Sequence, residues 1–392
     1  MNIKIILLLV TLIISHQSFG FDESELPAEF QGYKWNSTIK ISYEDITQLY
    51  DAFVVDMGMS GKKKLKRSKA KTGTRLKSNR KLYTALEANR FYYENFKDED
   101  TKVLLTKVRK SLEQVSNEVP INQLKEKEQL AYWLNLYNIT VLEQLVLRYP
   151  IKNLEDEILD DDSFLDEKLL TVSGHKLSLN YIHHKIIIGK FGKNKDVIYG
   201  LYQGNIGSPN IRKEAYTADK VVKQLEANAT EFINSNRGVF KGKKNKLRIS
   251  KFYEQNQAVF PNFKEDFTKH LLYYANGPIR QDIENAKSFK MNIENWTITD
   301  VFGSVRTYGA SINNNGAAML DSVNSNQDSN AGEGFQGSQA VNMGFIASTV
   351  SEKTVDYGRF SADQLELLQK MNDIQLKADG SVTITDIEED NQ

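Results

Sequence analysis

The feature that most limits how this chain can fold is an apolar helical run, Leu130 to Leu147, that contains two asparagines. Asn135 and Asn138 lie in it three residues apart, close to Tyr132. Asparagine is a poor helix former because its amide competes for backbone hydrogen bonds. A buried amide without partners costs about 1–3 kcal/mol. We therefore expect a core helix whose amides are used by the fold or by a site.

The composition excludes several classes of function. The 392 residues carry 51 basic and 51 acidic side chains, so the net charge argues against binding to nucleic acid or a membrane surface by the protein as a whole. The chain has no cysteine, which excludes a thiol nucleophile, a thiolate metal site and an acylated lipoprotein N-terminus. The length allows one large domain or two medium ones.

Residues 1–20 have the pattern of a secretory signal peptide. Lys4 supplies the positive start, and the apolar run from Ile5 to Ile14 is too short to span a bilayer. Small residues at Ser18 and Gly20 suit a cleavage site. We expect an exported protein, periplasmic or extracellular, with no transmembrane segment; an uncleaved anchor is the alternative.

The rest of the chain divides by composition into a main domain, residues 21–309, a flexible Asn/Ser/Gly linker, 310–358, and a C-terminal helix and tail, 359–392. A basic loop inserted at residues 62–81 holds eleven Lys or Arg and no acid. It is either a solvated loop or a docking patch for a protein, a peptide or an anionic polymer. Aromatic residues are almost absent from it, so we expect no specific nucleic-acid partner.

The hydrophobic spacing predicts a mixed α+β, helix-rich fold with a few short strands. Helices are expected over 43–56, 85–118, 124–149, 179–189 and 218–234, and short strands near 170–172, 197–202, 239–240, 247–249 and 291–296. Residues 155–167 hold eight acidic side chains but no calcium-loop register, which favours a solvated acidic loop.

Four motifs follow one another along the main domain. The first is Trp133-Leu-Asn-Leu-Tyr-Asn138, and the second is Leu177-Ser-Leu-Asn-Tyr-Ile-His-His184. The third is Leu201–Pro209, which ends in a glycine loop at 203–209, with Ala215-Tyr-Thr217 after it. The fourth is Asn295-Trp-Thr-Ile298. Together they resemble the family called domain of unknown function 547, over about residues 85–300.

The resemblance implies a site at the glycine loop, but this chain departs from the family pattern there. Many members have cysteines where this chain has Gln203 and Ser208, which suggests a thiol hydrolase in those members. The family's histidine falls on His184, and His183 replaces an acidic residue. Cysteine-dependent catalysis is therefore excluded for this chain.

Several readings of the polar residues remain open. Ser208 as nucleophile, His184 as base and Asn138 or Asn135 as orienting group would make a serine hydrolase, although Ser208 lies in a Ser-Pro turn without a nucleophile elbow. A metal at His183–His184 is disfavoured because adjacent helical residues point about 100° apart.

The remaining interpretations assign these polar residues no catalytic role. The uncharged groups either lock helix to strand or bind a polar ligand or peptide through Tyr132, Asn135, Asn138, His184 and Gln203. We expect no metal and no cofactor. The leading hypothesis is an exported, non-catalytic or degenerate-site binding or scaffold protein, and the alternative is a Ser- or metal-dependent hydrolase in the same cleft.

Overall fold

The computed structural model describes residues 21–62, 83–84, 87–151, 153–242, 245–301 and 358–379, with side chains described as far as residue 370. Three features expected from the sequence fall outside these residues. They are the signal peptide at 1–20, the basic loop apart from Lys62, and the linker apart from Gly358. The tail beyond Asp379 also lies outside them.

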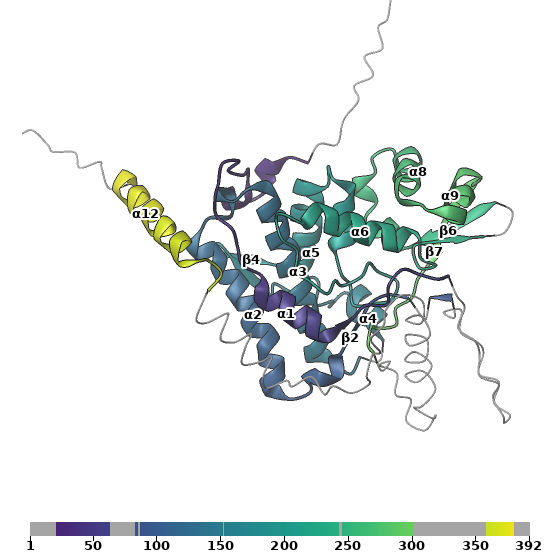
Figure 1. The fold of residues 1–392 in the computed structure, drawn as a ribbon, viewed down its shortest axis with the longest axis horizontal. Helices are drawn as coiled ribbons and strands as arrows, with labels where there is room; N and C mark the ends of the chain where they lie inside the picture. The colour runs from purple at the N-terminus through teal and green to yellow at the C-terminus, as the bar shows by residue number, and fades with distance from the viewer. Residues whose placement is uncertain are drawn as a thin grey trace, which may run out of the picture.

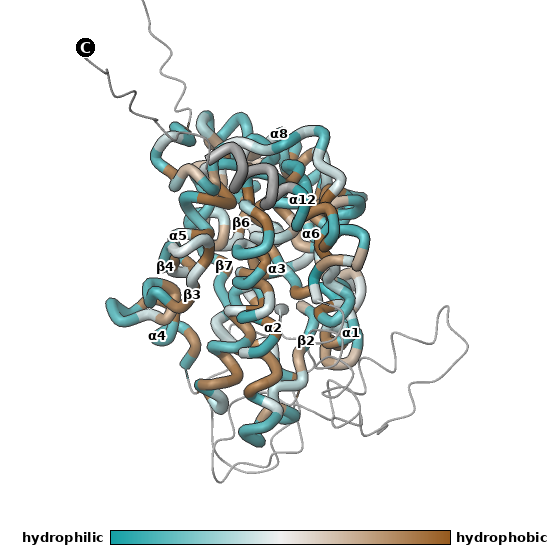
Figure 2. The backbone as a smooth tube through the Cα atoms, turned by 90° about the vertical axis from the view of Figure 1, so that its left-hand side faces the viewer, coloured by the Kyte–Doolittle hydropathy of each residue, from teal (hydrophilic) through white to brown (hydrophobic). Residues whose placement is uncertain are grey.

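The centre of the molecule is α3, Glu126–Arg148, which is buried from Glu128 to Val146 without interruption. Figure 1 shows α3 inside the main body, with α2 and α6 to either side of it. The second long helix, α2 (Glu99–Glu118), is amphipathic and packs against α3 with one apolar stripe. That stripe is Leu104, Leu105, Val108, Leu112 and Val115. The hydropathy view has the same arrangement, with apolar segments along α2 and α3 (Figure 2).

The other helices surround this pair. They are α1 (Glu44–Phe53), α4 (Leu154–Leu159), α5 (Leu179–Tyr181), α6 (Val221–Ile233), α7 (Phe252–Gln255), α8 (Phe263–Tyr274), α9 (Gly277–Glu284) and α12 (Ala362–Asp379). A π-helix, Ile182–Lys190, continues α5, and a 3-10 helix occupies Lys195–Gly200. Shorter 3-10 turns lie at Glu23–Glu25, Ala28–Phe30, Tyr93–Phe96, Ile121–Gln123 and Gln257–Val259.

The strands of the described residues are short and form small sheets, as the helix-rich α+β prediction requires. They are β1 (Val54–Val55), β2 (Arg90–Phe91), β3 (Leu170–Val172), β4 (His175–Leu177), β5 (Val239–Lys241), β6 (Lys246–Ser250) and β7 (Ser288–Ile293). The first two pairs, β1–β2 and β3–β4, are antiparallel. The third sheet has the order β5-β6-β7, in which β7 runs parallel to β6 after the α7–α9 excursion.

Two expected elements differ from the structure. The helix expected over 85–118 begins only at Glu99, because β2 and a 3-10 turn precede it. The strand expected over 197–202 is wrong, because Lys195–Gly200 is a 3-10 helix. Its β-branched residues, Val197 and Ile198, are fully buried, and packing overrides their strand propensity. In addition, part of the expected acidic loop is helical, as α4.

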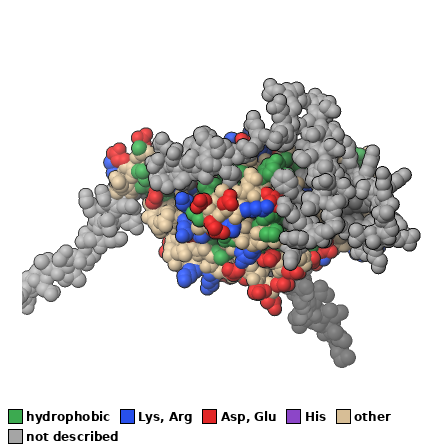
Figure 3. Space-filling model, turned by 90° about the horizontal axis from the view of Figure 1, so that it is seen from below, with side chains coloured by type: hydrophobic (Ala, Val, Ile, Leu, Met, Phe, Trp, Pro, Cys, Tyr) green, Lys and Arg blue, Asp and Glu red, His purple; other side chains and the backbone are tan. Residues whose placement is uncertain are grey.

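The surface agrees with the balanced composition. On the visible part of the face seen from below, acidic and basic side chains are interspersed (Figure 3). Among the described residues, each helix is too short or too polar to cross a lipid bilayer.

The C-terminal segment is anchored to the main body by Arg359. Its guanidinium donates to both Asp45 carboxylate oxygens, at 2.5 and 2.7 Å, and both side chains are only 4% exposed. It also donates to the Ser42 carbonyl oxygen at 3.0 Å and the Ser111 hydroxyl at 3.0 Å. Leu368 of α12 is buried whereas Leu365 is exposed, so the apolar side chains of this helix are only partly covered. Figure 1 shows α12 projecting from the body beyond this anchor.

We expect Arg359→Met to lower the free energy of unfolding by about 3–5 kcal/mol, because Asp45 then remains buried without its counter-charge. Urea denaturation of the full chain measures this. Lys370→Met is the matched control, since its pair with Glu366 is exposed and should contribute less than about 1 kcal/mol. Equal effects of the two substitutions would contradict the assigned anchor.

Candidate functional site

The two asparagines of α3 each bind a backbone segment that has no regular partner. Asn138 donates from Nδ2 to the Gly200 carbonyl oxygen at 2.9 Å and accepts at Oδ1 from the Tyr202 N–H at 3.0 Å. Asn135 makes the same pair of bonds with the carbonyl oxygen and N–H of Tyr216, at 2.8 and 2.9 Å. Both amides are buried and use both polar atoms, so they fasten the chain on either side of the glycine loop to α3.

Tyr132, the third candidate on α3, is also directed into the protein. Its hydroxyl donates to the Leu112 carbonyl oxygen of α2 at 3.1 Å, and its side chain is fully buried. Burial raises the pKa of this phenol well above its ordinary value. Tyr132 therefore joins α3 to α2, and its hydroxyl does not face the glycine loop.

The glycine loop, defined here as residues 203–209, is held against the segment 295–299. The N–H of Ile206 donates to the Thr297 carbonyl oxygen at 2.9 Å. The N–H of Gly207 donates to the Asn295 carbonyl oxygen at 3.0 Å. Gly204 has φ +79°, and a Cβ there would lie 2.3 Å from Leu145 Cδ1. The third and fourth motifs of the sequence are therefore brought together, with α3 behind them.

Ser208 lies inside this loop rather than at its surface. Its side chain is fully buried, and Oγ donates to the Asn205 carbonyl oxygen at 2.9 Å. The backbone carbonyl of Ser208 accepts from the buried guanidinium of Arg237. A hydroxyl bonded to its own turn and closed off from solvent is not placed to attack a substrate.

The two histidines divide between the interior and the surface. His183 is buried, with Nε2 at 2.8 Å from Asn256 Oδ1, whereas His184 is exposed and stacks on the His183 ring with centroids 4.1 Å apart. Burial, with a smaller effect of His184, lowers the pKa of His183 to about 3. Burial also lowers the pKa of His184, against the opposing effect of Asp166. Among the described residues, no three side chains are grouped to hold a metal.

The structure therefore separates some candidates and joins others. Ser208 and His184 share no contact within the described part of the chain. Gln203 and His183 instead meet consecutive residues at the end of α7, since Gln203 Nε2 donates to Gln255 Oε1 at 2.9 Å and His183 meets Asn256. Gln255 and Asn256 were not predicted from the sequence as site residues. Their signal is the amide-rich run Gln255-Asn256-Gln257.

A polar groove opens beside this junction. We call it the amide groove; its lining includes Gln203, Asn205, Lys251, Gln255, Asn295 and Trp296. It has room for about 20 Å³, which is the size of a water-sized group. Of the five candidate ligand-binding residues, only Gln203 lines it.

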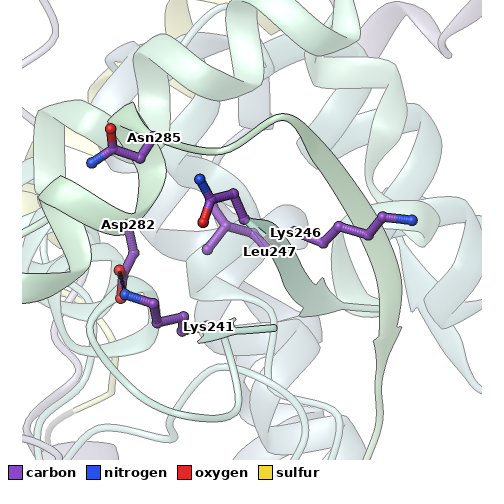
Figure 4. Close-up of a pocket in the computed structure, with 6 residues that line it drawn as sticks. Lys241, Lys246, Leu247, Asp282 and Asn285 are labelled. Atoms are coloured by element: carbon purple, nitrogen blue, oxygen red, sulfur yellow. Dashed lines mark hydrogen bonds and ion pairs between the residues drawn. The ribbon is translucent and has the colours of Figure 1, made fainter. Parts of the chain in front are cut away.

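Two other pockets lie outside the four motifs. One, of about 200 Å³, lies between the β5–β6 turn and α9, where Lys241 and Asp282 point toward each other and form an ion pair of 2.5 Å (Figure 4). The other, of about 340 Å³, borders His270, whose Nε2 lies 2.9 Å from the Tyr199 hydroxyl. Burial lowers the pKa of His270 to about 4.

We expect Asn138→Leu to destabilise the fold by about 1–3 kcal/mol, because the Gly200 carbonyl and the Tyr202 N–H lose their buried partner. Chemical denaturation measures the loss. Asn117→Leu, on the exposed face of α2, is the control and should change little. An unchanged melting temperature together with lost ligand binding would instead assign Asn138 to a site.

We also expect the protein to lose stability as the pH falls below 6.5, the ordinary histidine pKa. With folded-state pKa values of about 3 for His183 and about 4 for His270, the unfolded chain takes up protons in this window that the folded protein does not. Glu128 has the opposite effect on stability. Burial raises the pKa of its carboxyl to about 7, so its contribution to the free energy of unfolding is lost as the pH rises toward that value.

The histidine contribution is isolated by substitution. His183→Gln should reduce the stability lost between pH 6.5 and about pH 4.5 by roughly 2 kcal/mol, measured by urea unfolding at both values. His175→Gln is the control, since that ring is 41% exposed. Parallel pH profiles for the two variants would contradict the assignment.

Residues 121–233 match the family described as Protein of unknown function, DUF547. No curated protein and no solved structure matches the chain. The matched stretch contains the motifs at 132–138, 177–184 and 201–217, whereas the motif at 295–298 and the lining residues on α7 lie beyond it. The resemblance predicted from the sequence is thereby confirmed over this part of the chain: residues 121–233, with α3, the π-helix and the glycine loop, match the DUF547 family.

Proposed function

We propose that this chain is an exported, non-catalytic binding protein whose ligand site is the amide groove. The observation that carries the proposal is the separation of Ser208 from His184. The hydroxyl is buried and bonded to the Asn205 carbonyl, and the ring lies exposed on the π-helix. A serine hydrolase requires the nucleophile, its base and the substrate within hydrogen-bond reach of one another.

The chemistry of the groove supports binding rather than catalysis. By the family resemblance, Gln203 falls where many members have a cysteine, and a carboxamide is neither a nucleophile nor a general base at neutral pH. His183 bonds to Asn256 directly after α7, and its pKa of about 3 makes it a weak base, whereas a catalytic base works best with a pKa near the operating pH.

Export and partner binding belong to the same proposal. The positive start and apolar run of residues 1–20 favour secretion to a periplasm or the cell exterior. The charge of residues 62–81 suits an anionic partner that docks beside the domain, which would make the protein a scaffold as well as a ligand binder.

We expect a screen of ester, peptide and amide substrates to give no turnover above background with the full chain. Ser208→Ala and His184→Ala should match the unmodified protein in the same screen. Turnover that disappears in either variant, while the variant keeps the native melting temperature, would overturn the proposal in favour of a hydrolase.

A further inference from the structure

The amide groove contains a buried side chain whose hydrogen-bonding groups the protein leaves unused. Asn205 is only 3% exposed and lines the groove, yet its carboxamide has no hydrogen-bond partner among the described residues. The loop glycine beside it, Gly207, keeps this space open: a Cβ there would lie 2.9 Å from the Asn295 N and 3.3 Å from Asn205 Oδ1. The carboxamide of Asn205 can therefore donate to and accept from a group that enters the groove.

The neighbouring amide pair adds one unused donor and one unused acceptor. Gln203, which is 7% exposed, donates from Nε2 to Gln255 Oε1. In the described part of the chain this leaves Gln203 Oε1 and Gln255 Nε2 without partners. If both amides were rotated by 180°, a donor on Gln203 and an acceptor on Gln255 would remain instead. The groove therefore offers both kinds of group in either orientation.

The charge of the lining favours a neutral ligand. Its only ionised side chains among the described residues are Lys251 and Glu294, which pair with each other at 2.5 Å and are 45% and 41% exposed. A ligand charge at Asn205 or Gln203 would lose its hydration without meeting a counter-charge, which is costly.

The size of the groove limits what enters it to one small group. About 20 Å³ is available between Gln203 and Trp296, and Phe252 and Ile293 supply apolar walls. This space admits only the edge of a planar carboxamide, whose carbonyl oxygen and N–H complement the unused donors and acceptors of the three side-chain amides. A sugar ring carries several hydroxyls on a wider body, so it fits this space less well.

We propose that the amide groove recognises a neutral carboxamide presented by a peptide, such as the side chain of a glutamine or asparagine. The ligand carbonyl accepts from the amide nitrogens of Asn205 and Gln255, and its N–H donates to the amide oxygens of Asn205 and Gln203. This inference rests on the proposed binding function and names the ligand class for the same groove.

The test is calorimetric titration of the full chain with N-acetyl-glutamine methylamide and with its charged analogue, N-acetyl-glutamate methylamide. We expect saturable binding of the glutamine compound and at least tenfold weaker binding of the glutamate compound. Asn205→Leu and Gln255→Leu should each weaken binding of the glutamine compound at least tenfold. Gln255 is only half-buried, so its variant tests the site even if Asn205→Leu does not fold. Asn285→Leu, an exposed amide on the surface, is the matched control and should bind normally.

Three results would overturn the inference. They are no saturable binding of the glutamine compound, equal affinity for the two compounds, and unchanged affinity in folded Gln255→Leu. Selective binding of N-acetylglucosamine over the glutamine compound would also overturn it, in favour of an amino-sugar ligand. The titration and the substrate screen test separate claims. A failure to bind the glutamine compound would not show that the protein is an enzyme. Turnover in the substrate screen would not show that the groove fails to bind a carboxamide.

Discussion

The structure depends on a helix that is buried on every side. Since α3 has no face in water between Glu128 and Val146, each polar group on it needs a partner from the surrounding chain. Asn135 and Asn138 lie three residues apart and so point to one side of the helix, where each binds an N–H and a carbonyl of irregular backbone. Elsewhere on α3, Glu143 pairs with Arg109 of α2 at 2.5 Å. The polar residues of α3 thereby fix which segments surround it.

This constraint carries through to the amide groove. Asn138 holds the chain at Gly200 and Tyr202, so the glycine loop begins from a fixed point beside α3. The contact of Gly204 with Leu145 then brings the loop close to the helix, and the loop's other edge pairs with residues 295–299. Gln203 and Asn205 lie between these two attachments and line the groove. The groove is thus a consequence of how the buried helix satisfies its amides.

The sequence predicted the parts of the fold that depend on local pattern. The apolar periodicity located α2, α3 and α6, and the strand expected at 170–172 is β3, whereas its partner β4 was not expected. It could not predict the 3-10 helix at Lys195–Gly200, because that segment is set by tertiary partners: the Tyr199 carbonyl accepts from Asn228, and the Gly200 carbonyl accepts from Asn138. For the site, the motifs identified Gln203 but not Gln255 or Asn256, which come close only through the path of β6 into α7.

A site without a nucleophile can still bind a ligand through hydrogen bonds. Where a cysteine would need a base of matched pKa beside it, Gln203 needs only partners of complementary hydrogen-bonding type. His183 is held neutral by burial and bonded to Asn256, so it can orient α7 without exchanging a proton near neutral pH. Carboxamides do not titrate, and among the described residues that line the groove the only charged side chains, Lys251 and Glu294, pair with each other. For the proposed binding function, the forces available in the groove are shape and directed hydrogen bonds, which would select a neutral ligand by the geometry of its donors and acceptors rather than by charge.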